Sequence, residues 1–157
     1  MPDLHTNTYS ARKIYLATSW RNTQQPALVE LLRSIGHEVY DFRVPSAEQG
    51  GFHWSEVDPD YKSWTAKAFA DALVDSAATH RGFSFDKDAL DWCNTCVLLL
   101  PCGRSAHLEA GYAVGRGKRT IILLMDDHPL EPELMYLLCD QIVTTIPTLI
   151  AALRHHG

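Results

Sequence analysis

Short apolar runs alternate along the chain with longer stretches in which apolar residues recur at helical spacing. The runs predict five buried strands, within residues 14–17, 37–42, 95–100, 119–125 and 142–145. The helical spacing predicts helices over 26–35, 65–78, 86–94, 107–115, 130–138 and 147–153, with a turn around Gly82. This alternation is typical of an α/β fold, a single domain whose parallel sheet has helices on both faces.

Two segments lack this pattern. Residues 1–12 are polar, and we expect them to form a flexible N-terminal leader to a domain that spans residues 13–157. Residues 45–64 contain Pro, a pair of glycines and several aromatic residues with little periodicity. Long loops in compact domains are usually functional, so this loop is a candidate binding segment.

Ligands of a parallel α/β sheet bind at the carboxyl ends of the strands. The loops after Ala17, Phe42 and Pro101 are therefore expected to line one crevice. Trp20, just past the first strand, could stack on a planar base. Tyr15, within that strand, is either a core aromatic residue or a hydroxyl that orients a carboxylate.

Composition excludes several function classes. Lys and Arg number 14 against 19 Asp and Glu, a net charge of −5, and no run of basic residues is present to grip a nucleic-acid backbone. The longest apolar runs are far too short to cross a bilayer, and the N-terminal segment has no apolar signal core. The four cysteines are therefore expected to be reduced thiols of a cytoplasmic protein.

The first candidate for chemistry is GRSAHLEAGYAVGRGK, residues 103–118, directly after the most apolar strand. A glycine turn that leads into a helix directs backbone N–H groups into the crevice and suits an anion. We expect Glu109 in the first turn of this helix, where the helix dipole favours the ionised carboxylate. A fixed carboxylate is what the nucleophile of glycosyl transfer requires; the alternative is that Glu109 simply occupies a helix N-terminus.

The second candidate is FDKDALDWCN, residues 85–94, on the helix that leads into the same strand. It offers Asp86, Asp88 and Asp91, and acid–base catalysis pairs one protonated carboxylic acid with one carboxylate. At least two of these three aspartates are expected to belong to a solvated helix face.

No metal site is predicted. Cys93 and Cys96 form a single C-x-x-C pair without the second pair of ligands that zinc requires, so both are interpreted as packing residues. His53, His107 and His128 show no metal-ligand spacing.

Together these segments resemble the nucleoside 2-deoxyribosyltransferase family, whose relatives include nucleoside 5'-monophosphate N-glycosidases. The resemblance covers roughly residues 13–153 and rests on IYLATSWRN, on GGFHWSEVDPDY, on Asp86 with Asn94 eight positions on, and on the 103–118 motif. Its most specific part is EAGYA at 109–113 followed by Gly117 and Lys118, which is similar to the nucleophile motif of the family.

The resemblance implies a flavodoxin-like or Rossmann-like sheet and a homo-oligomer, a dimer or higher, whose site is closed by a neighbouring subunit. It implies Glu109 as the nucleophile on the anomeric carbon and Tyr15 as the residue that holds it. An aspartate ahead of the central strand would donate a proton to the leaving base: Asp86 fits best and Asp88 is the runner-up. No metal or organic cofactor is required.

The nucleobase side of the family is similar to the strand that ends in Trp20 and to the Pro-Asp-Tyr of 59–61. Arg104 and Ser105, together with backbone N–H groups, suit a phosphate better than a 5'-hydroxyl, although Arg104 could be exposed and Ser105 could cap the helix. The candidate substrate-binding residues are Thr18, Ser19, Trp20, Arg21, Trp54, Tyr61, Gly103, Arg104, Ser105 and His107.

The predicted function is cleavage of the N-glycosidic bond of a nucleotide or nucleoside through a covalent glycosyl-enzyme, with transfer of the sugar to water or to another base. Three alternatives stay open. The crevice could sense a nucleotide without catalysis, the chain could be a glycohydrolase of NAD or a similar dinucleotide, or the aromatic residues of 45–64 could form a partner surface.

Overall fold

The computed structural model describes residues 10–155, and these fall into two compact units. Unit 1 consists of residues 10–39 and 93–155, and unit 2 is Tyr40–Trp92. Most of the predicted leader, residues 1–9, lies outside the described residues. Each unit is described by itself.

Unit 1 is built on a parallel sheet of five strands in the order β2-β1-β3-β4-β5. This order is that of the flavodoxin-like, doubly wound sheets. The strands β2 and β5 have three residues each, whereas β3 has five and is buried along its whole length. The strands are β1 (Lys13–Ala17), β2 (Glu38–Tyr40), β3 (Thr95–Leu99), β4 (Arg119–Leu123) and β5 (Gln141–Val143).

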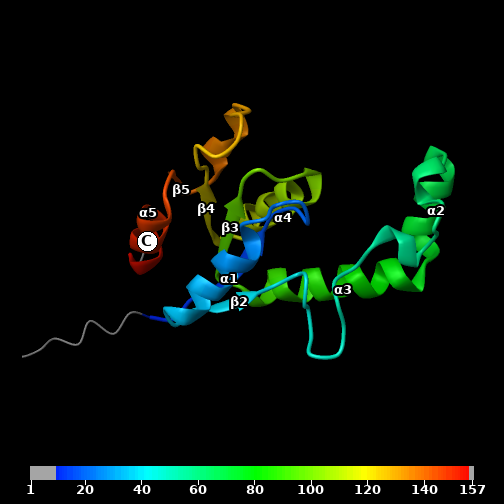
Figure 1. The fold of residues 1–157 in the computed structure, drawn as a ribbon, viewed down its shortest axis with the longest axis horizontal. Coiled ribbons are helices and arrows are strands. Elements are labelled where there is room, and N and C mark those ends of the chain that lie inside the picture. The colour runs from blue at the N-terminus through cyan, green and yellow to red at the C-terminus, as the bar shows by residue number, and fades with distance from the viewer. Residues whose placement is uncertain (1–9, 156–157) are drawn as a thin grey trace, which may run out of the picture. The chain divides into compact units, whose positions relative to one another are not determined.

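Helices cover both faces of this sheet (Figure 1). One face packs against α1 (Gln25–Ser34) and α5 (Ile146–Arg154), which contribute Leu28, Leu32 and Leu149 to the core. The other face, on which Tyr15 and Cys96 are neighbours, packs against α4 (Arg104–Gly115). The prediction of an α/β fold with a five-stranded parallel sheet and helices on both faces is confirmed.

Small side chains bring α4 close to the sheet. Ala106, Ala110 and Ala113 are the buried residues of this helix, and each is at most 4% exposed. A helix with alanine on its inner face approaches a sheet closely, so residues on the flanks of α4 also lie near the strands. This close approach sets the position of Glu109, described below.

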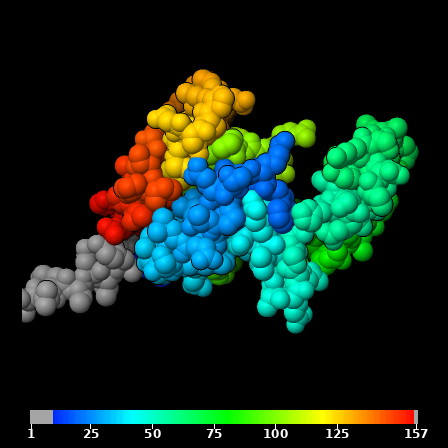
Figure 2. Space-filling view, viewed as in Figure 1, coloured from blue at the N-terminus to red at the C-terminus, as the bar shows by residue number. Residues whose placement is uncertain are grey.

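The connection between β4 and β5 lies on the surface of unit 1 (Figure 2, yellow to orange) and exposes several apolar side chains. A short helix was predicted over 130–138, and the structure has a 3-10 helix, η3 (Leu134–Leu138). Leu134 and Leu137 are 75% and 81% exposed. Such exposed apolar patches commonly mark contact surfaces.

Unit 2 contains η1 (Trp54–Glu56), η2 (Tyr61–Ser63), α2 (Ala66–Asp75) and α3 (Ala77–Trp92). The Thr65 side chain caps α2, and Thr79 at the start of α3 donates to carbonyl groups of α2. Within residues 10–155, no helix has both the length and the apolar character needed to cross a membrane.

The predicted turn around Gly82 is wrong, because α3 runs without interruption through this residue. The break lies earlier, at Ser76, between α2 and α3. Gly82 is required for a close approach rather than for a turn: a Cβ atom there would lie 2.8 Å from the Cβ atom of Phe52. Such a contact comes from the tertiary structure and leaves no periodic signal in the sequence.

Gly82→Ala is expected to destabilise unit 2 by up to about 2 kcal/mol, because overpacking costs about 1–3 kcal/mol and Ala recovers about 1 kcal/mol relative to Gly in a helix. Urea unfolding followed by Trp fluorescence measures the effect. The matched control is Gly111→Ala in α4, where an added Cβ would meet nothing within 4 Å. That control should be neutral or stabilising, and a Gly82 variant at least as stable as the wild type would contradict the argument.

Candidate active site

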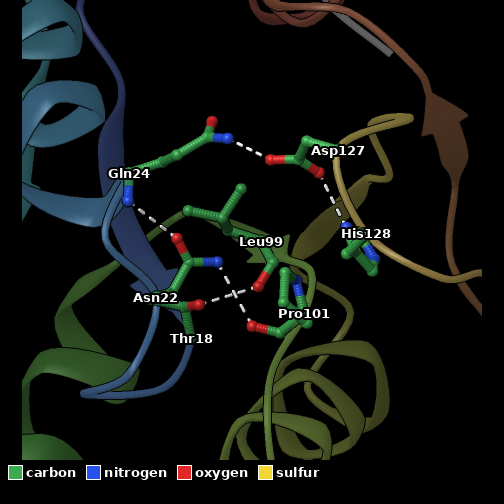
Figure 3. Close-up of polar contacts among 7 residues, drawn as sticks. All are labelled: Thr18, Asn22, Gln24, Leu99, Pro101, Asp127 and His128. Atoms are coloured by element: carbon green, nitrogen blue, oxygen red, sulfur yellow. Dashed lines mark hydrogen bonds and ion pairs between the residues drawn. The ribbon is translucent and has the colours of Figure 1, made fainter.

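The carboxyl ends of β1 and β3 form the switch point of the sheet, since the chain leaves these neighbouring strands toward opposite sides. Two side-chain hydrogen bonds join the loops that follow them (Figure 3). The Thr18 hydroxyl donates to the Leu99 carbonyl oxygen at 2.8 Å, and the Asn22 amide donates to the Pro101 carbonyl oxygen at 3.2 Å. Two of the three loops that were predicted to line the crevice are therefore held together where they leave the strands.

The predicted binding residues after β1 divide into two kinds. Thr18 is only 8% exposed and its hydroxyl is bonded to Leu99, so it supports the end of the strand. The Ser19 hydroxyl accepts a hydrogen bond from the Arg21 backbone and shapes the turn. Trp20, 39% exposed, and Arg21 have side chains that a ligand could reach.

A chain of polar contacts continues from this loop to the β4–β5 connection (Figure 3). Asn22 Oδ1 accepts from the Gln24 backbone at 3.0 Å, the Gln24 amide donates to Asp127, and Asp127 lies 2.7 Å from His128 Nδ1. Sequence reasoning did not single out Asn22 or Gln24, because polar residues after a strand are ordinary turn residues.

Helix α4 begins one turn earlier than predicted. Its N-cap is Gly103 and its first residue is Arg104, so Glu109 is the sixth helical residue and lies in the second turn. The placement of Glu109 in the first turn is wrong, and the helix dipole, which acts mainly within that turn, does not hold its charge. The physical reason is Ala106, which is 1% exposed and anchors the first turn against the sheet.

Glu109 nevertheless lies where its charge affects buried groups. Burial, and then the negative charge of Glu109, raise the pKa of the Cys102 thiol to about 12. Glu109 also contributes, after burial and Cys93, to a pKa of Cys96 well above its usual range. Since Cys96 is the β3 neighbour of Tyr15, the half-buried Glu109 carboxylate acts on the sheet face that holds the tyrosine. Tyr15, 1% exposed, stays the predicted residue that holds Glu109.

The first turn of α4 can receive an anion. Gly103 has no side chain to cap the helix, and Ser105 is the second helical residue rather than its cap. Arg104 and Ser105 are both exposed. Backbone N–H groups at a helix start favour negative charge, and an adjacent guanidinium adds to this preference.

His107 supports the turn before α4. Its Nδ1 lies 2.8 Å from the Gly103 carbonyl oxygen, and its Nε2 lies 2.9 Å from the Tyr136 hydroxyl. A carbonyl oxygen only accepts, so Nδ1 carries the proton; in the neutral ring the Tyr136 hydroxyl then donates to Nε2. The two rings also stack, with centroids 5.8 Å apart. This arrangement favours a positioning role for His107 over the predicted contact with substrate.

Two replacements of His107 distinguish the role of its Nδ1 atom from that of its Nε2 atom. His107→Asn keeps a donor close to the Nδ1 position and should preserve the turn, whereas His107→Gln places its amide near Nε2 and loses the bond to Gly103. Loss of a bond of about 1 kcal/mol allows local opening about fivefold more often. The rate at which a thiol reagent modifies Cys102, 3.6 Å from His107 Nδ1, measures this opening. Equal rates in both variants would contradict the positioning role.

In unit 2, Asp86 differs in burial from the other two aspartates of the predicted group, Asp88 and Asp91. Asp86 is half-buried and accepts a hydrogen bond from the Tyr40 hydroxyl at 2.9 Å. Burial raises the pKa of Asp86, and the Tyr40 hydrogen bond partly opposes this. Asp88 and Asp91 are exposed, and Asp91 pairs with Lys87. Burial therefore favours the protonated form of Asp86.

Trp54 and Tyr61, predicted on the nucleobase side, belong to an aromatic cluster of unit 2. The Trp54 ring meets Phe52, Trp64 and Phe69 edge-on, with centroids 5.0 to 5.9 Å apart. Tyr61 contacts Trp64 at 6.4 Å. These contacts give both residues a packing role in unit 2, and their role in binding a base stays a prediction.

Among residues 10–155, no group of three or more His, Cys, Asp or Glu side chains is arranged to hold a metal ion. Cys93 and Cys96 form no disulfide among the described residues, and both are buried, as their interpretation as packing residues requires.

No protein-family model and no curated protein matches the chain. A conserved protein from Enterococcus faecalis V583 is similar in structure, with a TM-score of 0.55 and 17% identity over 92% of this chain and 98% of that one. The CMP N-glycosidase BcmB of Clostridium botulinum is 18% identical, with a TM-score of 0.47, and the match covers 89% of this chain and 96% of that one. The likeness to the Enterococcus protein supports the fold assigned above.

Proposed function

We propose that the protein cleaves the N-glycosidic bond of a nucleotide, with Glu109 as nucleophile and Asp86 as proton donor. The supporting observation is the contrast between these two carboxyl groups. Burial raises the pKa of Asp86, whereas Glu109 acts as a negative charge that raises the pKa of Cys102. Retaining glycosidases pair one protonated carboxylic acid with one carboxylate, and the raised pKa of Asp86 suits the first of these roles.

In the proposed reaction, a Glu109 oxygen attacks C1' of the sugar and the bond from C1' to the base nitrogen breaks. The electron pair of that bond stays with the base, which takes the proton of Asp86. The resulting Asp86 carboxylate then removes a proton from water, which attacks C1' and releases Glu109 with net retention. A second base in place of water would give transfer. The mechanism requires the two carboxyl groups to be about 5 Å apart in the reacting complex.

The start of α4 supports a nucleotide rather than a nucleoside as substrate. Its first turn has no capping side chain, and Arg104 and Ser105 are exposed there. A 5'-phosphate would find backbone N–H donors, a hydroxyl and a guanidinium at one place.

Chromatography of reaction mixtures tests the proposal. The protein is incubated with nucleosides, nucleoside 5'-monophosphates and NAD, with and without a second base. Free base from the monophosphates is the expected result, and exchanged base would identify a transferase. Nicotinamide release alone would favour an NAD glycohydrolase, and nucleotide binding with no base released in any mixture would leave a non-catalytic sensor and contradict the proposal.

We also propose that the protein is a homo-oligomer that associates through the surface of η3 and α4. Leu108, Leu134 and Leu137 expose 75% or more of their area on this surface of unit 1. Leu137→Asp is expected to reduce the molar mass in light scattering to that of one chain. Val74→Asp, an exposed apolar residue of unit 2, is the control. A monomeric wild type, or an oligomer unaffected by Leu137→Asp, would contradict this surface.

A further inference from the structure

A basic pocket lies at the amino ends of the strands of unit 1, the edge opposite to the loops of the candidate active site. Its volume is about 580 Å³. Arg12 directly precedes β1, Arg119 begins β4 and Asp140 directly precedes β5. The lining residues are Arg12, Val114, Gly117, Lys118, Arg119, Leu138 and Asp140. The pocket is therefore separate from the site proposed for catalysis.

Two guanidinium groups converge beside this pocket. Arg12 Nη2 and Arg119 Nη1 both donate to the carbonyl oxygen of His155, at 2.6 and 2.8 Å. Arg12 also donates to the Leu153 carbonyl at 2.6 Å, and Arg119 to the Ala152 carbonyl at 3.0 Å. Two donors on one oxygen keep the positive groups close together at the end of α5.

The hydrogen bonds of these arginines do not neutralise their charges. Among residues 10–155, every acceptor of their hydrogen bonds is an uncharged carbonyl, hydroxyl or amide oxygen. Burial and then the charge of Arg119 lower the pKa of Arg12, as expected for neighbouring like charges. Arg119 Nε is buried and makes no hydrogen bond within the described chain. Such groups favour a bound counter-charge.

Lys118 adds a third positive charge, and its Nζ donates to the Cys93 carbonyl oxygen at 2.5 Å. The one carboxylate among the lining residues is Asp140, which accepts from the Thr120 backbone at 2.7 Å. Three cationic residues against one anionic residue leave an excess of positive charge in a concave site. This arrangement attracts a small multivalent anion.

We propose that this pocket binds a phosphate-type anion, either inorganic phosphate or the phosphate group of a small monoester. A tetrahedral dianion can accept from guanidinium and ammonium donors on several sides at once. The pocket volume exceeds that of phosphate alone and leaves room for a sugar. The inference does not depend on the proposed catalytic function.

The test is isothermal titration of the full chain with inorganic phosphate and with ribose 5-phosphate, at constant ionic strength set by chloride. Wild-type protein is expected to bind one phosphate at this pocket with a Kd of about 1 mM. Lys118→Gln is expected to weaken this binding about tenfold or more, because it removes a charge-assisted donor. Asp140→Asn should strengthen it, since its carboxylate repels the anion. Arg12 and Arg119 are left intact because they cap α5.

Two control variants locate the bound anion. Arg116→Gln removes an exposed charge two positions before Lys118 that does not line the pocket, and it should leave the Kd unchanged. Arg104→Gln alters the start of α4 and should also leave this binding unchanged. Tighter binding of ribose 5-phosphate would identify the monoester as the ligand, and tighter binding of phosphate would identify the free ion. No saturable binding, an unchanged Kd in Lys118→Gln, or loss of binding only in Arg104→Gln would overturn the proposal.

Discussion

Glu109→Gln is expected to lower kcat by about 10³-fold or more, because it removes the nucleophile and with it the covalent route. The substitution keeps the size of the side chain, so the fold of unit 1 should be unchanged. Base release from the substrate identified by chromatography measures the effect. Glu30→Gln, which removes an exposed carboxylate from α1, is the matched control and should retain wild-type turnover.

A second measurement on the Glu109 variant does not depend on activity. The charge of Glu109 contributes to the raised pKa of Cys102, so the thiol should titrate at lower pH in Glu109→Gln than in the wild type. The pH dependence of alkylation at Cys102 reports this shift. Wild-type turnover in Glu109→Gln would end the nucleophile assignment, and an unchanged thiol titration would show that the carboxylate does not act on Cys102.

Asp86→Asn is expected to lower kcat by about 10²- to 10⁴-fold, the usual contribution of a general acid or base. The loss should be largest for bases that leave poorly without a proton. Asp88→Asn, on the same helix but exposed, is the matched control and tests the runner-up directly. A larger loss in the Asp88 variant than in the Asp86 variant would reverse the assignment.

The pH profile of kcat/KM tests the Asp86 assignment through the direction in which it shifts in a Tyr40 variant. Burial raises the pKa of Asp86, and the hydrogen bond from Tyr40 lowers it. Tyr40→Phe removes only the lowering contribution, so the protonated acid should persist to higher pH. The limb on which activity falls with rising pH should therefore shift upward in Tyr40→Phe. A shift to lower pH would show that another group donates the proton.

The same carboxyl group affects stability. A carboxyl group whose pKa is higher in the folded than in the unfolded chain stabilises the fold below its unfolded pKa, and this contribution is lost as the pH rises through the folded pKa. Asn does not titrate, so Asp86→Asn removes this decrease in the free energy of unfolding with rising pH. The difference in unfolding free energy between variant and wild type should therefore move in favour of the variant as the pH rises from acid to neutral.

The sequence predicted the sheet well because burial leaves a local signal. All five residues of β3 are buried, and its apolar run stands out without knowledge of its neighbours. The predicted bounds of helices were wrong where tertiary contacts determine them. Gly82 lies inside α3 because Phe52 packs on it, and α4 begins at Arg104 because Ala106 is pressed against the sheet.

The residues of the candidate site stay predictions, but the structure shows contacts of several of them that the sequence does not. Thr18 and His107 were chosen as ligand contacts, yet their polar atoms are bonded to partners 81 and 29 positions away. A single sequence gives no means to pair such distant groups. Asp86 was separable from Asp88 only once burial was known, since both occur in one short acidic segment of the sequence.

The pairing of β1 with β3 has a consequence for folding kinetics. Thr18 and Leu99 are 81 positions apart, with all of unit 2 between them in the chain, whereas β3 and β4 are joined by the single helix α4. Closing the longer loop costs more chain entropy, so the β3–α4–β4 segment is expected to form first and β1 to dock late. The loops after β1 and β3, which border the candidate active site, would then be among the last parts to assemble. A newly synthesised chain would become active only after β1 has docked and the sheet is complete.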